Sequence, residues 1–339
     1  MIKQPYKRLL ELTTKCFVKH GVPFEDASII SDSLVTADQY GVHSHGLDVL
    51  PAHIQKITKG DYNLKPQIRI EKETPNSALV NGDNSIGPLS ALFCANLIIE
   101  KCSDRAIFIV NSFNNNTLGA AFFYSLIMAK NGLIGITLSN SPAQMPIHGG
   151  KDKLLGTNPF SIVIPNGQTP LIIDMATSVV AKSKFEQYRK LGIQLENGWA
   201  LDADGHPTTD PVKGIDGLVL PMAGFKGYGL SLAIDIIAGL LSKASYLNEV
   251  GRFYSKDNKP MDVGYAMIGI NPSLIFGEGF EKEVEEYTKK LRASSLAPGY
   301  DKVSLPGDDR LECFHRSTGE GISISENIYL ELLKSETNG

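Results

Sequence analysis

Gly41-Val42-His43-Ser44-His45-Gly46 is the stretch around which the rest of the chain is arranged. It holds two of the chain's seven histidines, with a hydroxyl group between them and a glycine at each end. Residues 24–40 and 47–59 carry apolar side chains at helical spacing, so the pattern predicts a joint between two helices. Gly41 stands where a helix often ends in a residue with positive φ. Side chains at such a joint can reach a cleft, because backbone groups there lack helical partners.

Ser44 and His45 are the candidate catalytic residues of this joint. Histidine is the side chain best suited to proton transfer near neutral pH, and a neighbouring hydroxyl group can orient its ring. The alternative is a capped turn in which the histidines only bond to the backbone. The spacing alone does not choose between these two interpretations.

Length and composition bound the classes to which the chain can belong. The 339 residues are 42% hydrophobic, which is enough for a large core and about two domains. The formal net charge is −4 and basic residues are scattered, so no nucleic-acid-binding surface is expected. The longest apolar run, residues 230–241, contains Asp235 and is too short to span a bilayer. No signal-peptide pattern, metal-ligand spacing or disulfide framework is visible, so a cytoplasmic setting without a metal is expected.

Helical and strand-like segments alternate along the chain, which predicts an α/β fold with a largely covered sheet. Helical spacing covers most of residues 6–60 and returns at residues 87–101, 118–130, 183–191, 229–242, 278–291 and 324–333. Strand-like segments lie at residues 65–82, 106–110, 133–138, 160–164, 171–173 and 266–270. Residues 192–224 form a long Gly/Pro-rich connection, which does not fit a simple doubly wound sheet.

The sequence lacks the Rossmann dinucleotide fingerprint, because no GxGxxG follows a strand. The nearest glycine-rich candidate for phosphate binding is Gly149-Gly150 followed by Leu155-Gly156-Thr157-Asn158-Pro159. Gly, Asn and Pro also mark ordinary turns, so this segment alone is a weak indication.

Several motifs, taken in their order along the chain, together resemble one family. They are Ala37-Asp38 with Gly41 to Gly46, Gly119-Ala120-Ala121, Ser139-Asn140-Ser141, Leu155 to Pro159, Asp174-Met175-Ala176-Thr177-Ser178, Gly198-Trp199-Ala200, Pro207 to Pro211, Gly224 to Leu230, and Pro306-Gly307-Asp308. This set is similar to the type-2 malate/L-lactate dehydrogenases. Their relatives include sulfolactate and ureidoglycolate dehydrogenases, diketogulonate reductase and cyclic imino-acid reductases.

The resemblance implies an NAD(P)-dependent enzyme with a mixed α/β fold unlike the Rossmann domain. A helical N-terminal region, residues 1–75, would pack on a nucleotide-binding domain with a mixed sheet, residues 76–274. Residues 275–339 would return to the first region. The resemblance also implies a small-molecule substrate and a homodimer, with the active site in a cleft between domains and subunits.

Matching positions imply a set of residues that contact NAD or NADP. They are Ser141, Gly156, Thr157, Asn158, Asp174, Met175, Ala176, Lys226, Pro306, Gly307 and Asp308. A lysine can meet a phosphate as a point charge, and glycines let backbone N–H groups approach it closely. Asp174 alone has another interpretation, since an aspartate at a strand end often caps a turn. No residue distinguishes NADH from NADPH.

The chain departs from the family pattern at the expected proton donor. Hydride transfer to a carbonyl or imine carbon leaves a heteroatom that needs a proton from an acid. Family members usually have a histidine before the Gly-Ala-Ala motif, and Thr117 stands at that position here. A threonine hydroxyl can orient or relay a proton but is not a near-neutral acid. His45 is therefore the one acid that matches the family.

The chain also departs from the pattern where relatives hold a substrate carboxylate. Val49 and Ala52 stand where the resemblance implies two arginines, and the neighbouring Asp48 would repel an anion. His53 and Lys56 are nearby cations whose spacing does not require them to compensate. A larger, neutral or cationic substrate is expected in place of malate, lactate and other simple 2-oxo acids.

These observations lead to an NAD(P)-dependent oxidoreductase that reduces a carbonyl or imine carbon of an atypical substrate, with His45 as proton donor. Two alternatives stay open. One is a cyclic imino-acid reductase, although Lys184 occupies the place where some of those enzymes are thought to use a relay aspartate. The other is a nucleotide-binding homodimer that has lost dehydrogenase turnover.

Overall fold

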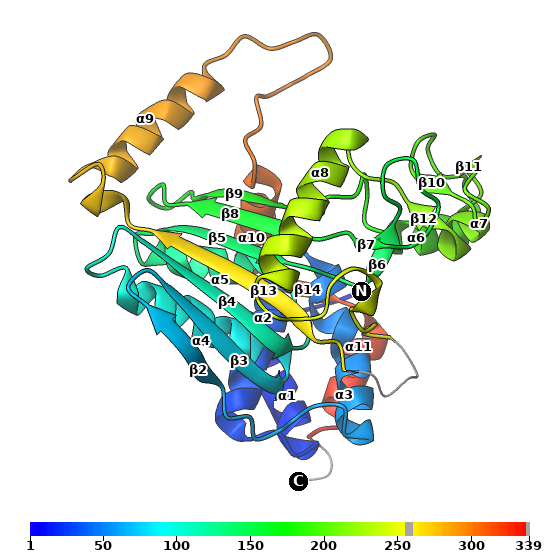
Figure 1. The fold of residues 1–339 in the computed structure, drawn as a ribbon, viewed down its shortest axis with the longest axis horizontal. Helices are drawn as coiled ribbons and strands as arrows, with labels where there is room; N and C mark the ends of the chain where they lie inside the picture. The colour runs from blue at the N-terminus through cyan, green and yellow to red at the C-terminus, as the bar shows by residue number, and fades with distance from the viewer. Residues whose placement is uncertain (255–259, 337–339) are drawn as a thin grey trace.

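The computed structural model describes residues 1–254 and 260–336. Within these residues a seven-stranded sheet forms the centre of the molecule, in the order β2-β3-β4-β13-β5-β8-β9 (Figure 1). Its strands are β2 (Arg69–Thr74), β3 (Ser77–Ser85), β4 (Ile107–Asn115), β13 (Val263–Ile270), β5 (Ile134–Ser139), β8 (Phe160–Ile164) and β9 (Leu171–Met175). β3 and β4 run parallel, and the other neighbours pair antiparallel. The predicted mixed α/β fold is therefore confirmed.

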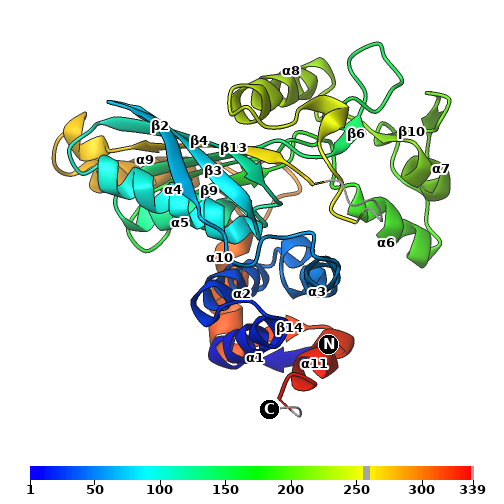
Figure 2. The ribbon, with the colours of Figure 1, turned by 60° about the horizontal axis from the view of Figure 1, so that its bottom comes forward.

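Helices cover both faces of this sheet (Figure 2). α4 (Gly87–Lys101) and α5 (Ala121–Lys130) lie on one face, and α8 (Phe225–Ile234) continues into a π-helical turn, η3 (Asp235–Leu240), on the other. The main core lies between α4, α5 and the sheet, where Tyr124, Tyr265 and Phe108 are fully buried. Gly269 allows α4 to approach closely, because a Cβ there would lie 2.2 Å from Ile98 Cγ2.

The N-terminal helices form a second core below the sheet (Figure 2). They are α1 (Tyr6–Lys19), α2 (Phe24–Gln39) and α3 (Leu50–Lys59), as the helical spacing of residues 6–60 predicts. β1 (Ile2–Gln4) pairs antiparallel with β14 (Ile322–Ile324), and α11 (Glu326–Leu333) packs on α1. The last helix was predicted from residue 324, but Ile324 ends a strand and the Ser325 side chain caps α11 by accepting from the N–H of Ile328.

The chain after residue 275 follows the large sheet before it returns to the N-terminal helices. α9 (Phe280–Arg292) lies beside the turn between β8 and β9, where the N–H of Gly167 donates to Glu281 at 3.3 Å. α10 (Asp308–Glu320) then runs from β9 to α2 (Figure 2). The sequence pattern predicts no helix at residues 308–320. The predicted domain boundaries at residues 75 and 275 stay a prediction.

The Gly/Pro-rich connection at residues 192–224 is more ordered than its composition indicates. It contains a small sheet of β10 (Ala200–Leu201), β11 (Pro207–Thr208) and β12 (Leu218–Val219), together with α7 (Pro211–Asp216). α6 (Ser183–Leu191) packs on α7, and β6 (Ala143–Met145) pairs with β7 (Leu155–Gly156) nearby. Among the described residues, no helix combines the length and apolar character that crossing a membrane requires.

Candidate active site

The turn between α2 and α3 has the predicted geometry. Gly41 adopts φ 77°, in the region that favours glycine, and the chain then makes two short 3₁₀ turns, η1 (His43–His45) and η2 (Leu47–Val49). α3 begins at Leu50, and Pro51 lies in its first turn, where the missing N–H costs no helical bond. The turn therefore presents Ser44 and His45 outside any regular helix.

Asp38 of α2 holds this turn in place. Its buried carboxylate accepts hydrogen bonds from the N–H of Leu47 and from His43 Nδ1, both at 2.7 Å. A Cβ on Gly46 would lie 2.3 Å from Asp38 Oδ1, so the close approach requires glycine. Asp38 belongs to one of the sequence motifs, but this role could not be predicted because the contact depends on how the turn folds back.

His45 is placed to transfer a proton. Its Nδ1 lies 2.9 Å from Ser44 Oγ, which leaves Nε2 as the nitrogen that can meet a substrate. His45 is exposed, and desolvation is the larger cause that lowers its pKa. The positive charge of Arg310 lowers this pKa further. The imidazolium is thus a stronger acid than an ordinary histidine.

Arg310, in the first turn of α10, places a positive charge at the end of β9 that was not predicted from the sequence. Its Nη2 lies 2.7 Å from Asp174 Oδ2 and 3.3 Å from the carbonyl oxygen of the same residue. The guanidinium also lies over the ring of Phe122 in α5, 5.3 Å from the centroid. The only signal available was a basic residue shortly after the Pro306-Gly307-Asp308 motif, with no predicted helix to place it.

Asp174, at the end of β9, is the partner of this arginine. Its side chain is 12% exposed, and desolvation raises its pKa. The charge of Arg310 and the N–H of Phe122 oppose that effect by lowering the pKa. The end of β9, the start of α5 and the start of α10 therefore meet at one charged pair. The charge of Arg310 in this pair lowers the pKa of His45.

Four of the predicted cofactor residues come together beside α8. The N–H of Ser141 donates to Asn158 Oδ1 at 3.0 Å, and the carbonyl oxygen of Gly156 accepts from Ser231 Oγ at 2.9 Å. The carbonyl oxygen of Thr157 accepts from the N–H of Thr177 at 2.9 Å. Asn158 is fully buried and donates to the Ser231 carbonyl oxygen at 2.9 Å, so its side chain links this segment to α8.

Among the predicted cofactor residues, Lys226 at the start of α8 and Met175 at the end of β9 are exposed to solvent. Gly224 adopts φ 61° before the helix, no side chain caps the first turn, and Lys226 is exposed. Met175, the last residue of β9, is 42% exposed, and Ala176 follows it directly. Uncapped N–H groups beside a lysine suit a phosphate, so this region fits the pyrophosphate of a dinucleotide.

The Pro306-Gly307-Asp308 turn is docked on β9. The carbonyl oxygen of Pro306 accepts from the N–H of Ile172 at 3.2 Å, and a Cβ on Gly307 would lie 2.9 Å from the same nitrogen. Asp308 accepts from Arg292 at 2.6 and 2.9 Å and from the N–H of Leu305. In this position the turn fixes the start of α10, and with it Arg310.

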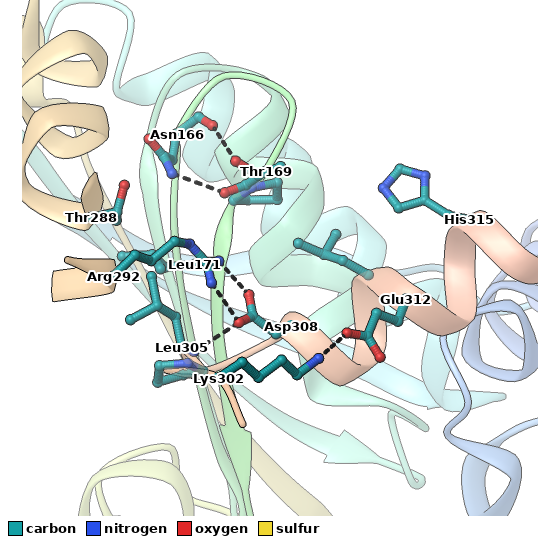
Figure 3. A pocket seen from close by; sticks show the side chains of 13 residues that line it. Asn166, Thr169, Leu171, Thr288, Arg292, Lys302, Leu305, Asp308, Glu312 and His315 are labelled. Carbon is teal, nitrogen blue, oxygen red and sulfur yellow. Dashed lines mark hydrogen bonds and ion pairs between the residues drawn. The ribbon is translucent and has the colours of Figure 1, made fainter. Parts of the chain in front are cut away.

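A cavity of about 270 Å³ lies next to this turn. Figure 3 shows that its walls come from the β8–β9 turn, α9, the loop before α10, and α10 itself. Its charged side chains are paired, Arg292 with Asp308 and Lys302 with Glu312 (Figure 3). Neither His45 nor Asp174 lines this cavity, so the candidate chemistry lies elsewhere.

Comparison with known proteins identifies the family. The model of the malate/L-lactate dehydrogenase family matches residues 5–333. This chain belongs to that family. It is 34% identical over 339 residues to a malate dehydrogenase of Pyrococcus horikoshii, covering 98% of this chain and 94% of the relative. The solved sulfolactate dehydrogenase of Methanocaldococcus jannaschii has a TM-score of 0.92 and 33% identity, covering 98% of this chain and 96% of that one. An NAD(+)-dependent ureidoglycolate dehydrogenase of Escherichia coli is 32% identical, covering 92% of this chain and 90% of the relative.

In this malate/L-lactate dehydrogenase family member, Thr117 lies in the loop between β4 and α5. Its backbone packs against α4, because a Cβ on Gly87 would lie 1.9 Å from the Thr117 carbonyl oxygen. Its hydroxyl group accepts from the N–H of Gly119 at 3.4 Å, and within the described residues no hydrogen bond joins it to His45. The structure therefore gives Thr117 no direct link to the Ser44–His45 pair.

His53 and Lys56, the two nearby cations of α3 in this family member, have other partners in the structure. Val49 is 9% exposed and lies in the N-terminal core. His53 is 2% exposed, its Nδ1 lies 3.1 Å from the hydroxyl oxygen of Tyr62, and burial lowers its pKa to about 4. Lys56 pairs with Asp61 at 3.1 Å. His53 and Lys56 thus have structural partners and do not replace the arginines that the resemblance implies.

Proposed function

We propose that this chain is an NAD(P)-dependent oxidoreductase that reduces the carbonyl or imine carbon of an atypical small-molecule substrate, with His45 as proton donor. The observation that carries the proposal is the Ser44–His45 pair, held in an open turn beside the Arg310–Asp174 pair. A chain of the malate/L-lactate dehydrogenase family provides the setting for this chemistry.

In this proposal, the chain's own residues supply the proton that the reduction needs. The nicotinamide supplies the hydride when it is bound. In the imidazolium form, His45 Nδ1–H donates to Ser44 Oγ, and Nε2–H is free to donate to the substrate oxygen or nitrogen. Negative charge develops on that atom as the hydride arrives, and the lowered pKa of His45 favours release of the proton to it. Asp38 stabilises the turn, so the ring does not have to be positioned during the reaction.

Cofactor binding is the first test of this proposal. We expect calorimetry to show that NADH or NADPH binds, with Lys226 at the start of α8 contacting a phosphate. Lys226→Ala should weaken the affinity by about 1.5–3 kcal/mol, the range for hydrogen bonds to charged groups. Lys72→Ala is the matched control, because Lys72 is exposed on β2 at the far edge of the sheet. Failure of the native protein to bind either nucleotide would refute the proposal.

A panel of carbonyl and imine compounds tests the reaction itself. We expect reduction of at least one compound other than pyruvate or oxaloacetate, followed as loss of NAD(P)H, because Val49 and Ala52 provide no carboxylate clamp. If no compound is reduced and His45→Asn changes only stability, the chain is a nucleotide-binding protein that has lost turnover. Fast turnover of malate or lactate would contradict the substrate part of the proposal.

We also propose that the chain forms a homodimer, as the resemblance implies. Along α8 and the residues that follow it, several large apolar side chains face solvent in the single chain. They are Phe225, Leu230, Ile236, Leu240 and Leu241, each at least 44% exposed. Light scattering should give the mass of two chains, and Ile236→Glu with Leu240→Glu should give one. Tyr287→Glu on α9, which is also exposed, is the control. A monomeric native protein would contradict this proposal.

A further inference from the structure

Four Asn-Gly pairs lie within the residues that the structure describes. Such a pair can modify itself, because glycine has no Cβ and its N–H reaches the side chain of the preceding asparagine with little hindrance. Attack of that nitrogen on the asparagine Cγ forms a succinimide ring and releases ammonia. The surroundings of each pair decide whether this attack is available. The pairs are Asn81-Gly82, Asn131-Gly132, Asn166-Gly167 and Asn197-Gly198.

In the Asn131-Gly132 pair, hydrogen bonds occupy both reacting groups. Asn131 Nδ2 donates to the carbonyl oxygen of Ile127 at 2.9 Å. The N–H of Gly132 donates to the carbonyl oxygen of Ala129 at 2.9 Å. These bonds hold the end of α5, so the attack would first have to break them.

The Asn166-Gly167 pair, in the turn between β8 and β9, is held in the same way and is also buried. Asn166 is 6% exposed, and its Nδ2 donates to the carbonyl oxygen of Thr169 at 3.1 Å. The N–H of Gly167 donates to Glu281 Oε2 at 3.3 Å. Solvent and the glycine nitrogen therefore both have restricted access to the Asn166 side chain.

The Asn81-Gly82 pair lies inside β3 of the large sheet. Asn81 is 8% exposed, and its Nδ2 donates to Glu71 Oε1 at 2.9 Å. Its Oδ1 accepts from the N–H of Asp83 at 2.9 Å. Ring formation at Asn81 would have to break these bonds and distort the strand, so we expect this pair to be protected.

The Asn197-Gly198 pair differs from the other three. Both residues are exposed, and within the described part of the chain neither the Asn197 side chain nor the N–H of Gly198 has a hydrogen-bond partner. The pair forms the centre of a turn before β10, which a bond from the N–H of Trp199 to the carbonyl oxygen of Glu196 closes at 3.3 Å. Gly198 adopts φ 82°, as the third position of such a turn often requires. The Asn197 side chain can therefore rotate without giving up a hydrogen bond.

We propose that Asn197 is the site at which this chain deamidates, and that the product alters the packing of Trp199. The nitrogen of Gly198 bonds to Cγ of Asn197, and the side-chain amide leaves as ammonia. Water then opens the ring and supplies the oxygen of a new carboxylate. Opening at Cγ gives aspartate. Opening at the backbone carbonyl keeps the bond between Cγ and the Gly198 nitrogen and gives isoaspartate, whose backbone is longer by one methylene group.

Trp199 is placed to detect this change. It is 7% exposed, its ring lies 5.3 Å from that of Tyr188, and Lys184 Nζ lies 5.2 Å from its ring centroid. Because the N–H of Trp199 closes the turn, a longer backbone at residue 197 displaces the indole from these partners. Trp199 is also the one tryptophan in the sequence, so its fluorescence reports this turn without interference.

Ageing the protein in mildly alkaline buffer made with heavy-oxygen water tests the inference. Peptide mapping by mass spectrometry locates each amide that becomes a carboxylate, and the heavy oxygen marks conversions that occur during ageing. We expect Asn197 to convert about tenfold faster, or more, than Asn131, because two hydrogen bonds must first break at Asn131. Asn81 and Asn166 should be slower than Asn197 as well. Equal rates at the four pairs, or the fastest conversion at another pair, would overturn the proposed site.

Three variants test the effect on Trp199. The fluorescence of the native protein should change as Asn197 is converted, whereas that of Asn197→Gln should stay constant, because glutamine forms the corresponding ring far more slowly. Asn131→Gln is the matched control and should age like the native protein. Asn197→Asp carries the new charge on a backbone of normal length, so when fresh it should resemble fresh native protein.

The contrary outcomes are equally specific. Constant native fluorescence despite conversion of Asn197, or an equal change in Asn197→Gln, would refute the effect on Trp199. A fresh Asn197→Asp protein that already resembles the aged native protein would assign the change to charge and contradict the lengthened backbone as its cause. None of these measurements needs a substrate or a cofactor, so their outcome is independent of the proposed function.

Discussion

His43 and His45 lie in the same turn, two residues apart, and the fold gives them opposite properties. His43 donates to the buried carboxylate of Asp38, and this hydrogen bond raises the pKa of His43. His45 faces Ser44 and the field of Arg310, and desolvation together with that charge lowers the pKa of His45. The difference shows that the residue type does not determine the role. The partners do, and they come from α2 for His43 and from α10 for His45.

His43 has a structural role in this turn, whereas the chemical role is the one we propose for His45. Asp38 connects His43 with the N–H of Leu47, so the His43 side of the turn is a rigid anchor. Among the residues that the structure describes, His45 has one hydrogen-bond partner, Ser44, and its other ring nitrogen has none. An acid that must gain and lose a proton during turnover needs this kind of environment, with its pKa set by charge and burial.

The largest expected effect separates the two histidines by activity. His45→Asn should lower the rate of reduction by about 10²–10⁴-fold, the usual range for loss of a general acid. Nucleotide affinity should remain nearly unchanged, since the proton is needed only in the transition state. His43→Asn should retain most of the activity, because an asparagine amide can still donate to Asp38. Steady-state kinetics on one substrate measures both, and equal losses in the two variants would contradict the comparison.

A smaller effect is expected on stability when Asp38, which holds the turn in place, is replaced. Asp38→Ala should lower the free energy of unfolding by about 1–3 kcal/mol, because the buried N–H of Leu47 and the ring of His43 lose their acceptor. Asp38→Asn should cost less, since its amide oxygen still accepts one of these bonds. Chemical unfolding of the three proteins measures the difference. Equal stability of native protein and Asp38→Ala would show that the turn does not depend on Asp38.

The smallest expected effect is the pH dependence of stability that His43 contributes. The folded-state pKa of His43 is raised above its unfolded value, so its stabilising contribution is present at pH below that unfolded value. The contribution is lost as pH rises through the folded pKa. The stability difference between native protein and His43→Gln should therefore be larger at about pH 5 than at about pH 9. A stability difference that grows with rising pH would contradict Asp38 as the partner that raises the pKa of His43. Because His43 is half-exposed, solvent screening keeps this effect small.

Much of the fold was predictable because its elements carry strong local patterns. The helices at residues 87–101 and 183–191 and the strand at residues 160–164 match the predicted bounds. α8 begins at Phe225, earlier than the predicted residue 229, because the glycines of its first turn weaken the helical pattern there. A π-helical turn then covers most of the rest of the predicted helix. β1 and β14 have only three residues each and are stabilised by pairing across nearly the whole chain, which no local pattern reveals.

The candidate site was predictable only in part, and α10 explains why. The glycines and histidines of the turn carry a recognisable spacing, and the structure gives Gly41 the expected positive φ. α10 has only two inward apolar residues, Leu311 and Phe314, so its periodicity is weak. Without that helix, the position of Arg310 could not be predicted, and the sequence offered His53 and Lys56 as the nearby cations. The roles of the predicted catalytic and cofactor residues stay predictions.

The pH dependence of reduction tests the central claim most directly, because it reports the proton that His45 is proposed to donate. We expect kcat/KM of the native protein to be high at low pH and to fall through a pKa below the ordinary histidine value, as the imidazolium is lost. The residual rate of His45→Asn should show no such fall over the same range. A native profile without this fall, or the same fall in His45→Asn, would contradict the assignment of His45 as the acid.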